Sequence, residues 1–156
     1  MIKFKDSFVV FEEVPDEITL ALNITNCQNR CVGCHSPELR KNIGEELTKE
    51  KLDALIAAND GITCVCFMGE GNDFAALLGL SNHIRAKYPY LKKALYSGRN
   101  IREGELRTLI SFFDYIKVGE YKPECGPLNN PKTNQRMYKF NDVEIVDITS
   151  KFWKKT

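Results

Sequence analysis

Residues 18–34, ITLALNITNCQNRCVGC, join a short apolar segment to a polar loop that carries three cysteines. The apolar part, Ile18 to Ile24, is short and contains several β-branched residues, which predicts a buried strand. The loop places Cys27, Cys31 and Cys34 at the spacing C-x3-C-x2-C. The sequence therefore predicts a cysteine-bearing loop at the carboxyl end of a strand.

Similar short apolar segments recur along the chain and alternate with helical patterns. Leucine and isoleucine recur at helical spacing in residues 48–57, 73–88 and 103–112. Strands are predicted at residues 18–24, 62–68, 93–96, 115–118 and 143–148, with a further one near residues 8–12 at an edge of the sheet. Strands that alternate with helices favour parallel βαβ units with right-handed crossovers. We therefore predict one α/β domain, residues 1–156, whose parallel sheet of about five to six strands forms an open, partial barrel.

Polar or glycine-bearing loops follow the predicted strands. The cysteine loop follows the first of the main strands, and the next three are followed by Gly69-Glu70-Gly71, Ser97-Gly98-Arg99 and Gly119-Glu120-Tyr121. In parallel α/β folds the carboxyl ends of the strands meet at one edge, and ligands bind there. We expect these four loops to build a single site.

The charge balance argues against a protein that binds nucleic acid or a membrane surface. The chain has 22 basic and 21 acidic residues among 156, a formal net charge of +1. Its first residues lack the apolar core of a signal peptide, and no run approaches the roughly 20 apolar residues of a membrane-spanning helix. These features predict a cytoplasmic protein. Six cysteines in such a chain are more often metal-binding, catalytic or buried than disulfide-bonded.

Three thiolates this close in sequence can face one soft metal centre. Structural zinc takes four protein ligands, and an ordinary iron–sulfur cluster usually takes four cysteines. A [4Fe–4S] cluster held by only three leaves one iron open for a small molecule, and the spacing favours this reading. The alternative is a zinc knuckle with His35, Cys64, Cys66 or Cys125 as its fourth ligand.

The cysteine loop resembles that of the radical S-adenosylmethionine superfamily. More narrowly, and across nearly its whole length, the chain is similar to the family of activating proteins of anaerobic ribonucleoside-triphosphate reductases. Three features carry this likeness: Gly33 before Cys34, a short chain without accessory clusters, and the segment Thr133-Asn134-Gln135. In contrast, Gly69-Glu70-Gly71 departs from the Gly-Gly-Glu or Gly-Gly-Asp order usual in the superfamily.

The resemblance implies an open, partial β/α barrel of the radical S-adenosylmethionine type. It implies that Cys27, Cys31 and Cys34 ligate a [4Fe–4S] cluster whose open iron binds S-adenosylmethionine. Reductive cleavage then yields methionine and a 5′-deoxyadenosyl radical, which abstracts hydrogen from a glycine of the large reductase subunit. It also implies a flavodoxin or ferredoxin-type electron donor, and it requires no catalytic side chain beyond the cluster ligands. The residues expected around S-adenosylmethionine are Gly33, His35, Gly69, Glu70, Gly71, Ser97 and Arg99.

Three other functions are weighed against this one. The chain could activate another glycyl-radical enzyme of the pyruvate formate-lyase type, which Gly33 and Asn134-Gln135 argue against. It could be a zinc-stabilised binding module without catalysis, or a simple electron-transfer protein. Cys64 and Cys66 lie two residues apart on a predicted strand and favour buried, apolar roles. Cys125 has no assigned role, and its loop, residues 122–136, is interpreted as a flap or as a surface for the reductase.

Overall fold

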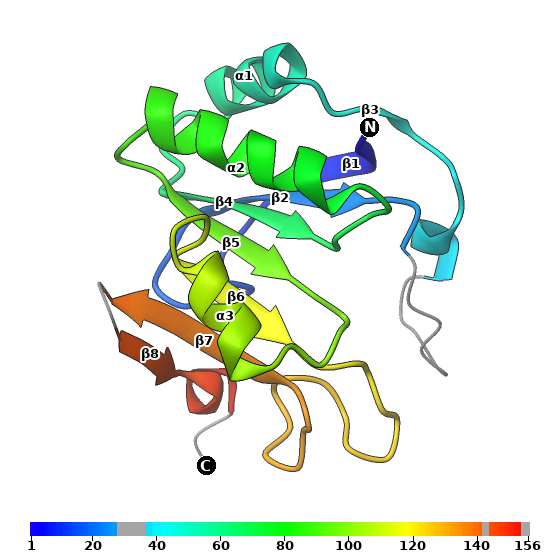
Figure 1. The fold of residues 1–156 in the computed structure, drawn as a ribbon, viewed down its shortest axis with the longest axis vertical. Helices are drawn as coiled ribbons and strands as arrows, with labels where there is room; N and C mark the ends of the chain where they lie inside the picture. The colour runs from blue at the N-terminus through cyan, green and yellow to red at the C-terminus, as the bar shows by residue number, and fades with distance from the viewer. Residues whose placement is uncertain (28–36, 142–143, 154–156) are drawn as a thin grey trace.

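The described part of the chain forms one open sheet of eight strands, covered on one face by three α-helices (Figure 1). The computed structural model describes residues 1–27, 37–141 and 144–153. The strands are β1 (Lys3–Val10), β2 (Thr19–Ile24), β3 (Glu45–Glu46), β4 (Cys64–Met68), β5 (Lys92–Tyr96), β6 (Tyr115–Val118), β7 (Arg136–Asn141) and β8 (Glu144–Asp147). The helices are α1 (Lys49–Ala58), α2 (Phe74–Lys87) and α3 (Glu103–Leu109), with 3-10 turns η1 (Pro37–Arg40) and η2 (Thr149–Phe152).

The centre of the sheet is parallel, as the sequence predicts. Strands β2, β4, β5 and β6 lie next to one another in that order, and the described part of each connection between them contains one α-helix. All three helices pack against the same face of the sheet. The core there includes Leu20, Leu22, Val65, Phe67 and Leu95 from the strands and Leu52, Ile56, Leu77, Ile84 and Leu106 from the helices.

Both flanks of the sheet are antiparallel, so the sheet is mixed rather than wholly parallel. β1 pairs with β2 and β3 on one side, and β7 pairs with β6 and β8 on the other. The predicted count of five to six strands was therefore too low. β7 was missed because its buried residues, Met137 and Phe140, are three positions apart and do not alternate. The N-terminal strand begins at Lys3 rather than near Phe8, and β3 forms the edge beside it.

The helices begin where the sequence predicts. Thr48 caps α1 by accepting a hydrogen bond from the Lys51 amide at 3.0 Å, and Asp73 caps α2 by accepting one from the Ala76 amide at 3.1 Å. α3 ends at Leu109, three residues before the predicted end, where a turn begins. Across residues 1–27, 37–141 and 144–153, none of the helices combines the length and apolar character needed to cross a bilayer.

A single carboxylate ties α1 to α2. Asp53 of α1 lies 2.8 Å from His83 Nε2 and accepts hydrogen bonds from Lys87 Nζ at 2.9 Å and the Tyr88 hydroxyl at 2.8 Å. Desolvation alone would raise the pKa of Asp53, but these contacts outweigh it and hold the pKa well below its usual range. The cluster therefore ties the middle of α1 to the C-terminal half of α2.

Loops and η2, instead of helices, cover the other face of the sheet. Val14, Leu128 and Ile148 pack there against Cys64 and Cys66, and both thiols are fully buried. Desolvation raises the pKa of both thiols. The prediction that these two cysteines act as small buried apolar residues is confirmed.

Candidate functional site

The carboxyl ends of the parallel strands lie level with one another. Asn23, Met68, Tyr96 and Lys117 pair in one row across β2, β4, β5 and β6. Because the strands end at or within one residue of this row, the loops that follow them start at the same edge. The predicted convergence of these loops is confirmed for their described residues, up to Cys27 in the case of the first loop.

The loop after β4 packs tightly against the end of β2. Gly69 and Gly71 have φ angles of +119° and +67°, in the left-handed region that favours glycine. A Cβ atom on Gly71 would lie 3.0 Å from Ile2 Cδ1, 3.1 Å from Ile24 Cγ2 and 3.3 Å from the Thr25 carbonyl oxygen. The two glycines thus allow close approach of the backbone and set the direction of the residue between them, Glu70.

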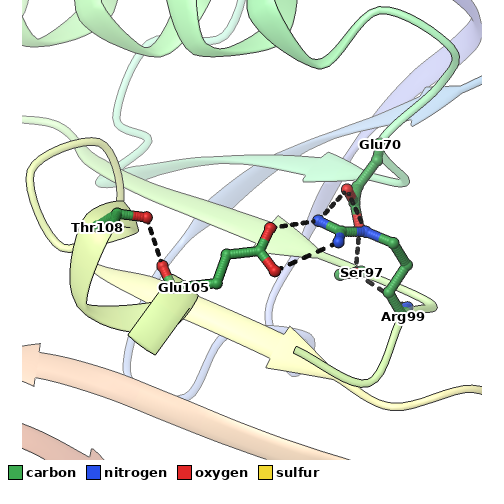
Figure 2. Close-up of polar contacts among 5 residues, drawn as sticks. All are labelled: Glu70, Ser97, Arg99, Glu105 and Thr108. Carbon is green, nitrogen blue, oxygen red and sulfur yellow. Dashed lines mark hydrogen bonds and ion pairs between the residues drawn. The ribbon is translucent and has the colours of Figure 1, made fainter. Parts of the chain in front are cut away.

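The Glu70 carboxylate is held by side chains from the next loop (Figure 2). The Ser97 hydroxyl donates to Glu70 Oε1, and Arg99 Nε donates to both carboxylate oxygens at 3.0 and 2.9 Å. The Glu70 side chain is only 12% exposed. The bond to Glu70 is the largest cause that raises the pKa of Arg99, so the guanidinium stays charged. Glu70 therefore has a fixed position before any ligand arrives.

A second carboxylate continues this network from α3. Arg99 Nη2 lies 3.1 Å from Glu105 Oε1, and Arg99 Nη1 donates to Glu105 Oε2 at 3.4 Å. The Arg99 guanidinium also lies over the Phe74 ring, 5.7 Å from its centroid. Arg99, expected from sequence to touch a ligand, thus bridges two carboxylates of the protein itself.

These residues line one pocket together with the first cysteine of the motif. The pocket has a volume of ≈ 370 Å³, within the range of about 300–1,000 Å³ common for small-molecule sites. Cys27 is half-buried, and its amide donates to the Leu39 carbonyl oxygen at 2.9 Å, which fixes its backbone at the pocket. The lining residues are Cys27, Glu70, Gly71, Asn72, Phe74, Arg99 and Glu105.

Several predicted residues support the pocket without lining it, and others lie outside the described part of the chain. Ser97 is fully buried beneath Glu70, and the Gly69 amide donates to the Tyr96 carbonyl oxygen at 3.0 Å, which holds the two loops side by side. Cys31, Gly33, Cys34 and His35 fall outside the described residues.

Three pocket residues were not predicted. Asn72 and Phe74 follow the glycine loop directly, and their nearness to it in sequence could have suggested them. Glu105 gave no such signal, because an acidic residue in the first turn of a helix is usually a solvated one that favours the helix dipole. The place of Glu105 at the pocket becomes clear from its ion pair with Arg99 in the folded protein.

The loop after β6 contacts the loop after β5, which carries Arg99. The Gly119 amide donates to the Arg99 carbonyl oxygen at 2.7 Å. Gln135 Nε2 donates to the Gly119 carbonyl oxygen at 3.3 Å, and Asn134 Nδ2 donates to that of Glu120 at 3.0 Å. The segment Thr133-Asn134-Gln135 therefore braces the loop after β6, which in turn contacts the loop that carries Arg99, and the segment is not among the residues that line the pocket.

In its described part the pocket offers one thiol and two carboxylates. Cys27 supplies a thiol, the preferred donor for iron–sulfur clusters, and Glu70 supplies a fixed carboxylate for a cationic group. Within the described residues no group of three His, Cys, Asp or Glu side chains could hold a metal ion. Two of the three predicted thiol ligands lie beyond that part of the chain. Cys64 and Cys66, buried with raised pKa values, are poor candidates for a fourth zinc ligand.

Comparison of the chain with protein-family models, with curated proteins and with solved structures finds no match.

Proposed function

We propose that the protein is a glycyl-radical activase, which cleaves S-adenosylmethionine at a [4Fe–4S] cluster to activate anaerobic ribonucleoside-triphosphate reductase. The observation that carries the proposal is the shared pocket. Cys27 after β2, Glu70 after β4 and Arg99 after β5 line it together, at the edge where parallel α/β folds bind ligands. The parallel strands advance in one direction with all helices on one face, which is the winding of β/α barrels. This supports an open, partial barrel of the radical S-adenosylmethionine type.

The residues of the chain have separable tasks in this proposal. Cys27, with Cys31 and Cys34, would hold the cluster through thiolates. When bound, the cluster supplies the electron that cleaves the sulfonium carbon–sulfur bond of the ligand. Glu70 offers its carboxylate to the amino group of the ligand, and Ser97 and Arg99 keep that carboxylate in place. Phe74 provides an apolar wall beside them.

The residues that suggest which enzyme is activated differ from those that suggest the reaction. Gly33 and the segment Thr133-Asn134-Gln135 resemble the family that activates anaerobic ribonucleoside-triphosphate reductases. The same segment braces the loop after β6 through Gly119 and Glu120. The proposed partners are thus the large reductase subunit, which carries the glycine, and a flavodoxin or ferredoxin-type electron donor.

Electron paramagnetic resonance tests the proposed reaction directly. The protein is reconstituted with iron and sulfide without oxygen, reduced, and measured with and without S-adenosylmethionine. We expect a [4Fe–4S]⁺ signal that changes when the ligand is added, and release of methionine and 5′-deoxyadenosine. Added reductase subunit should then acquire a glycyl radical.

Other outcomes would point to the other functions. A colourless protein that binds zinc would indicate a structural module. A cluster signal that S-adenosylmethionine leaves unchanged would indicate simple electron transfer. Cleavage of S-adenosylmethionine with radical transfer only to an enzyme of the pyruvate formate-lyase type would change the target and keep the reaction.

A further inference from the structure

We infer that Glu105 is a specificity-determining residue that makes the pocket prefer S-adenosylmethionine over its demethylated analogue, S-adenosylhomocysteine, which has no net charge. The inference rests on the proposed function, because it concerns the ligand of the same pocket. The inference explains how the pocket could favour a ligand with a charged sulfonium. The residue responsible lies on α3, outside the loops predicted from the sequence.

The described lining of the pocket has an excess of negative charge. Two carboxylates, Glu70 and Glu105, face one guanidinium, Arg99, and the other described lining residues are a cysteine, a glycine, an asparagine and a phenylalanine. One carboxylate would be enough to neutralise Arg99, and Glu70 already engages it through Nε and Nη2. Glu105 therefore brings the formal charge of these residues to −1.

The Glu105 carboxylate has a defined position at the pocket. Figure 2 shows its side chain reaching from α3 toward Arg99, with both oxygens directed at the guanidinium. Its backbone carbonyl oxygen accepts a hydrogen bond from the Thr108 hydroxyl at 2.6 Å, within the same helix. Glu105 and Arg99 are each 40% exposed, so solvent weakens the field of this carboxylate without abolishing it.

The two ligands differ mainly in the charge on the sulfur atom, and this charge would interact with the Glu105 carboxylate. S-adenosylmethionine carries a methylated sulfonium and a net charge of +1, whereas S-adenosylhomocysteine has a neutral thioether and no net charge. Their amino, carboxylate and adenosine groups are the same. A unit charge that acts across a partly hydrated pocket of this size corresponds to a preference of about fivefold.

Isothermal titration of the anaerobically reconstituted protein with each ligand tests the inference. The quantity of interest is the ratio of the two dissociation constants, because changes in contacts that both ligands make equally cancel in it. We expect the E105Q variant to lose about fivefold of its preference for S-adenosylmethionine. The matched control is E103Q, which removes an acidic residue from the same helical turn, where Glu103 pairs with Arg107 at 2.9 Å and lies outside the pocket lining.

The outcomes separate this inference from the proposed function. A ratio that is unchanged in E105Q, or that falls equally in E103Q, would overturn the role of Glu105 while the wild-type protein still bound S-adenosylmethionine. A reconstituted wild-type protein that bound neither ligand would overturn both. A fall confined to E105Q would support both.

Discussion

Replacing Gly71 by alanine tests whether the glycine loop is held against β2 as described. The residue has φ of +67°, and its missing Cβ leaves room for Ile2, Ile24 and the Thr25 carbonyl. Thr25 lies two residues before Cys27, so the substitution presses on the element that brings the cysteine to the pocket. Both folding stability and ligand binding should therefore respond.

The expected loss of stability follows from three contributions. A left-handed conformation costs an alanine about 1–2 kcal/mol. Contacts of 3.0 and 3.1 Å with two methyl groups force a local shift, which in well-packed cores costs about 1–2 kcal/mol. Alanine also restricts the unfolded chain, which returns about 0.5–1 kcal/mol. The net expectation is a loss of about 2 kcal/mol, a large part of a typical domain stability of about 5–15 kcal/mol.

Urea unfolding followed by circular dichroism measures this loss, and the chain offers a control with the opposite sign. Gly79 lies inside α2, and a Cβ added there would have no neighbour within 4 Å. Gly79→Ala should therefore stabilise the protein by about 0.5–1 kcal/mol. A Gly71→Ala variant within about 0.5 kcal/mol of wild type, with unchanged affinity for S-adenosylmethionine, would refute the tight packing of this loop.

Three further predictions concern the helix cluster and the cysteines. Asp53→Asn should cost about 1–2 kcal/mol in urea unfolding at neutral pH, because it weakens contacts to α2, whereas exposed Asp60→Asn should cost little. The pKa of Asp53 is depressed in the folded state, so the stability that its carboxylate contributes is present above about pH 4 and is lost as the pH falls further. A destabilisation by Asp53→Asn that grows toward low pH would contradict this. Cys31→Ala should abolish S-adenosylmethionine cleavage while circular dichroism shows the fold retained, and Cys125→Ala should keep cleavage; near wild-type turnover by the former would disprove the cluster assignment. Cys66 should resist iodoacetamide in native protein, since burial raises the pKa of its thiol, and peptide mapping that finds rapid labelling would argue against its burial.

The sequence was most informative where the signals are local. Thr48 and Asp73 marked the starts of α1 and α2, and short apolar runs marked the four parallel strands. These elements depend on capping and on burial of consecutive residues, and both can be recognised in a short window. The convergence of the loops at one edge then followed from parallel topology alone.

Features that depend on distant partners were harder to predict. β7 owes its place to pairing with β6 and β8, and its own residues, RMYKFN, do not alternate cleanly. Strands near residues 8–12 and at residues 143–148 were predicted, but their antiparallel pairing was not, because strand direction is set by partners distant in the sequence. At the site, Arg99 was expected to meet a ligand, but Glu70 and Glu105 engage it from two other elements. Such ion pairs join residues 29 and 6 positions apart and leave no mark on sequence periodicity.

The strand order also bears on how a nascent chain can fold. Strand β4 pairs beside β2, and each strand from β5 to β8 then pairs beside the strand that precedes it in the chain. None of these strands has to insert between two strands that are already paired. The described residues that line the pocket, from Cys27 to Glu105, are all synthesised before β6 begins. Contacts between sequential neighbours reduce the loop-closure entropy that slows folding of sheets with long-range pairings. We therefore expect the pocket-bearing part of the sheet to assemble first on the ribosome, with β7 and β8 closing the flank last.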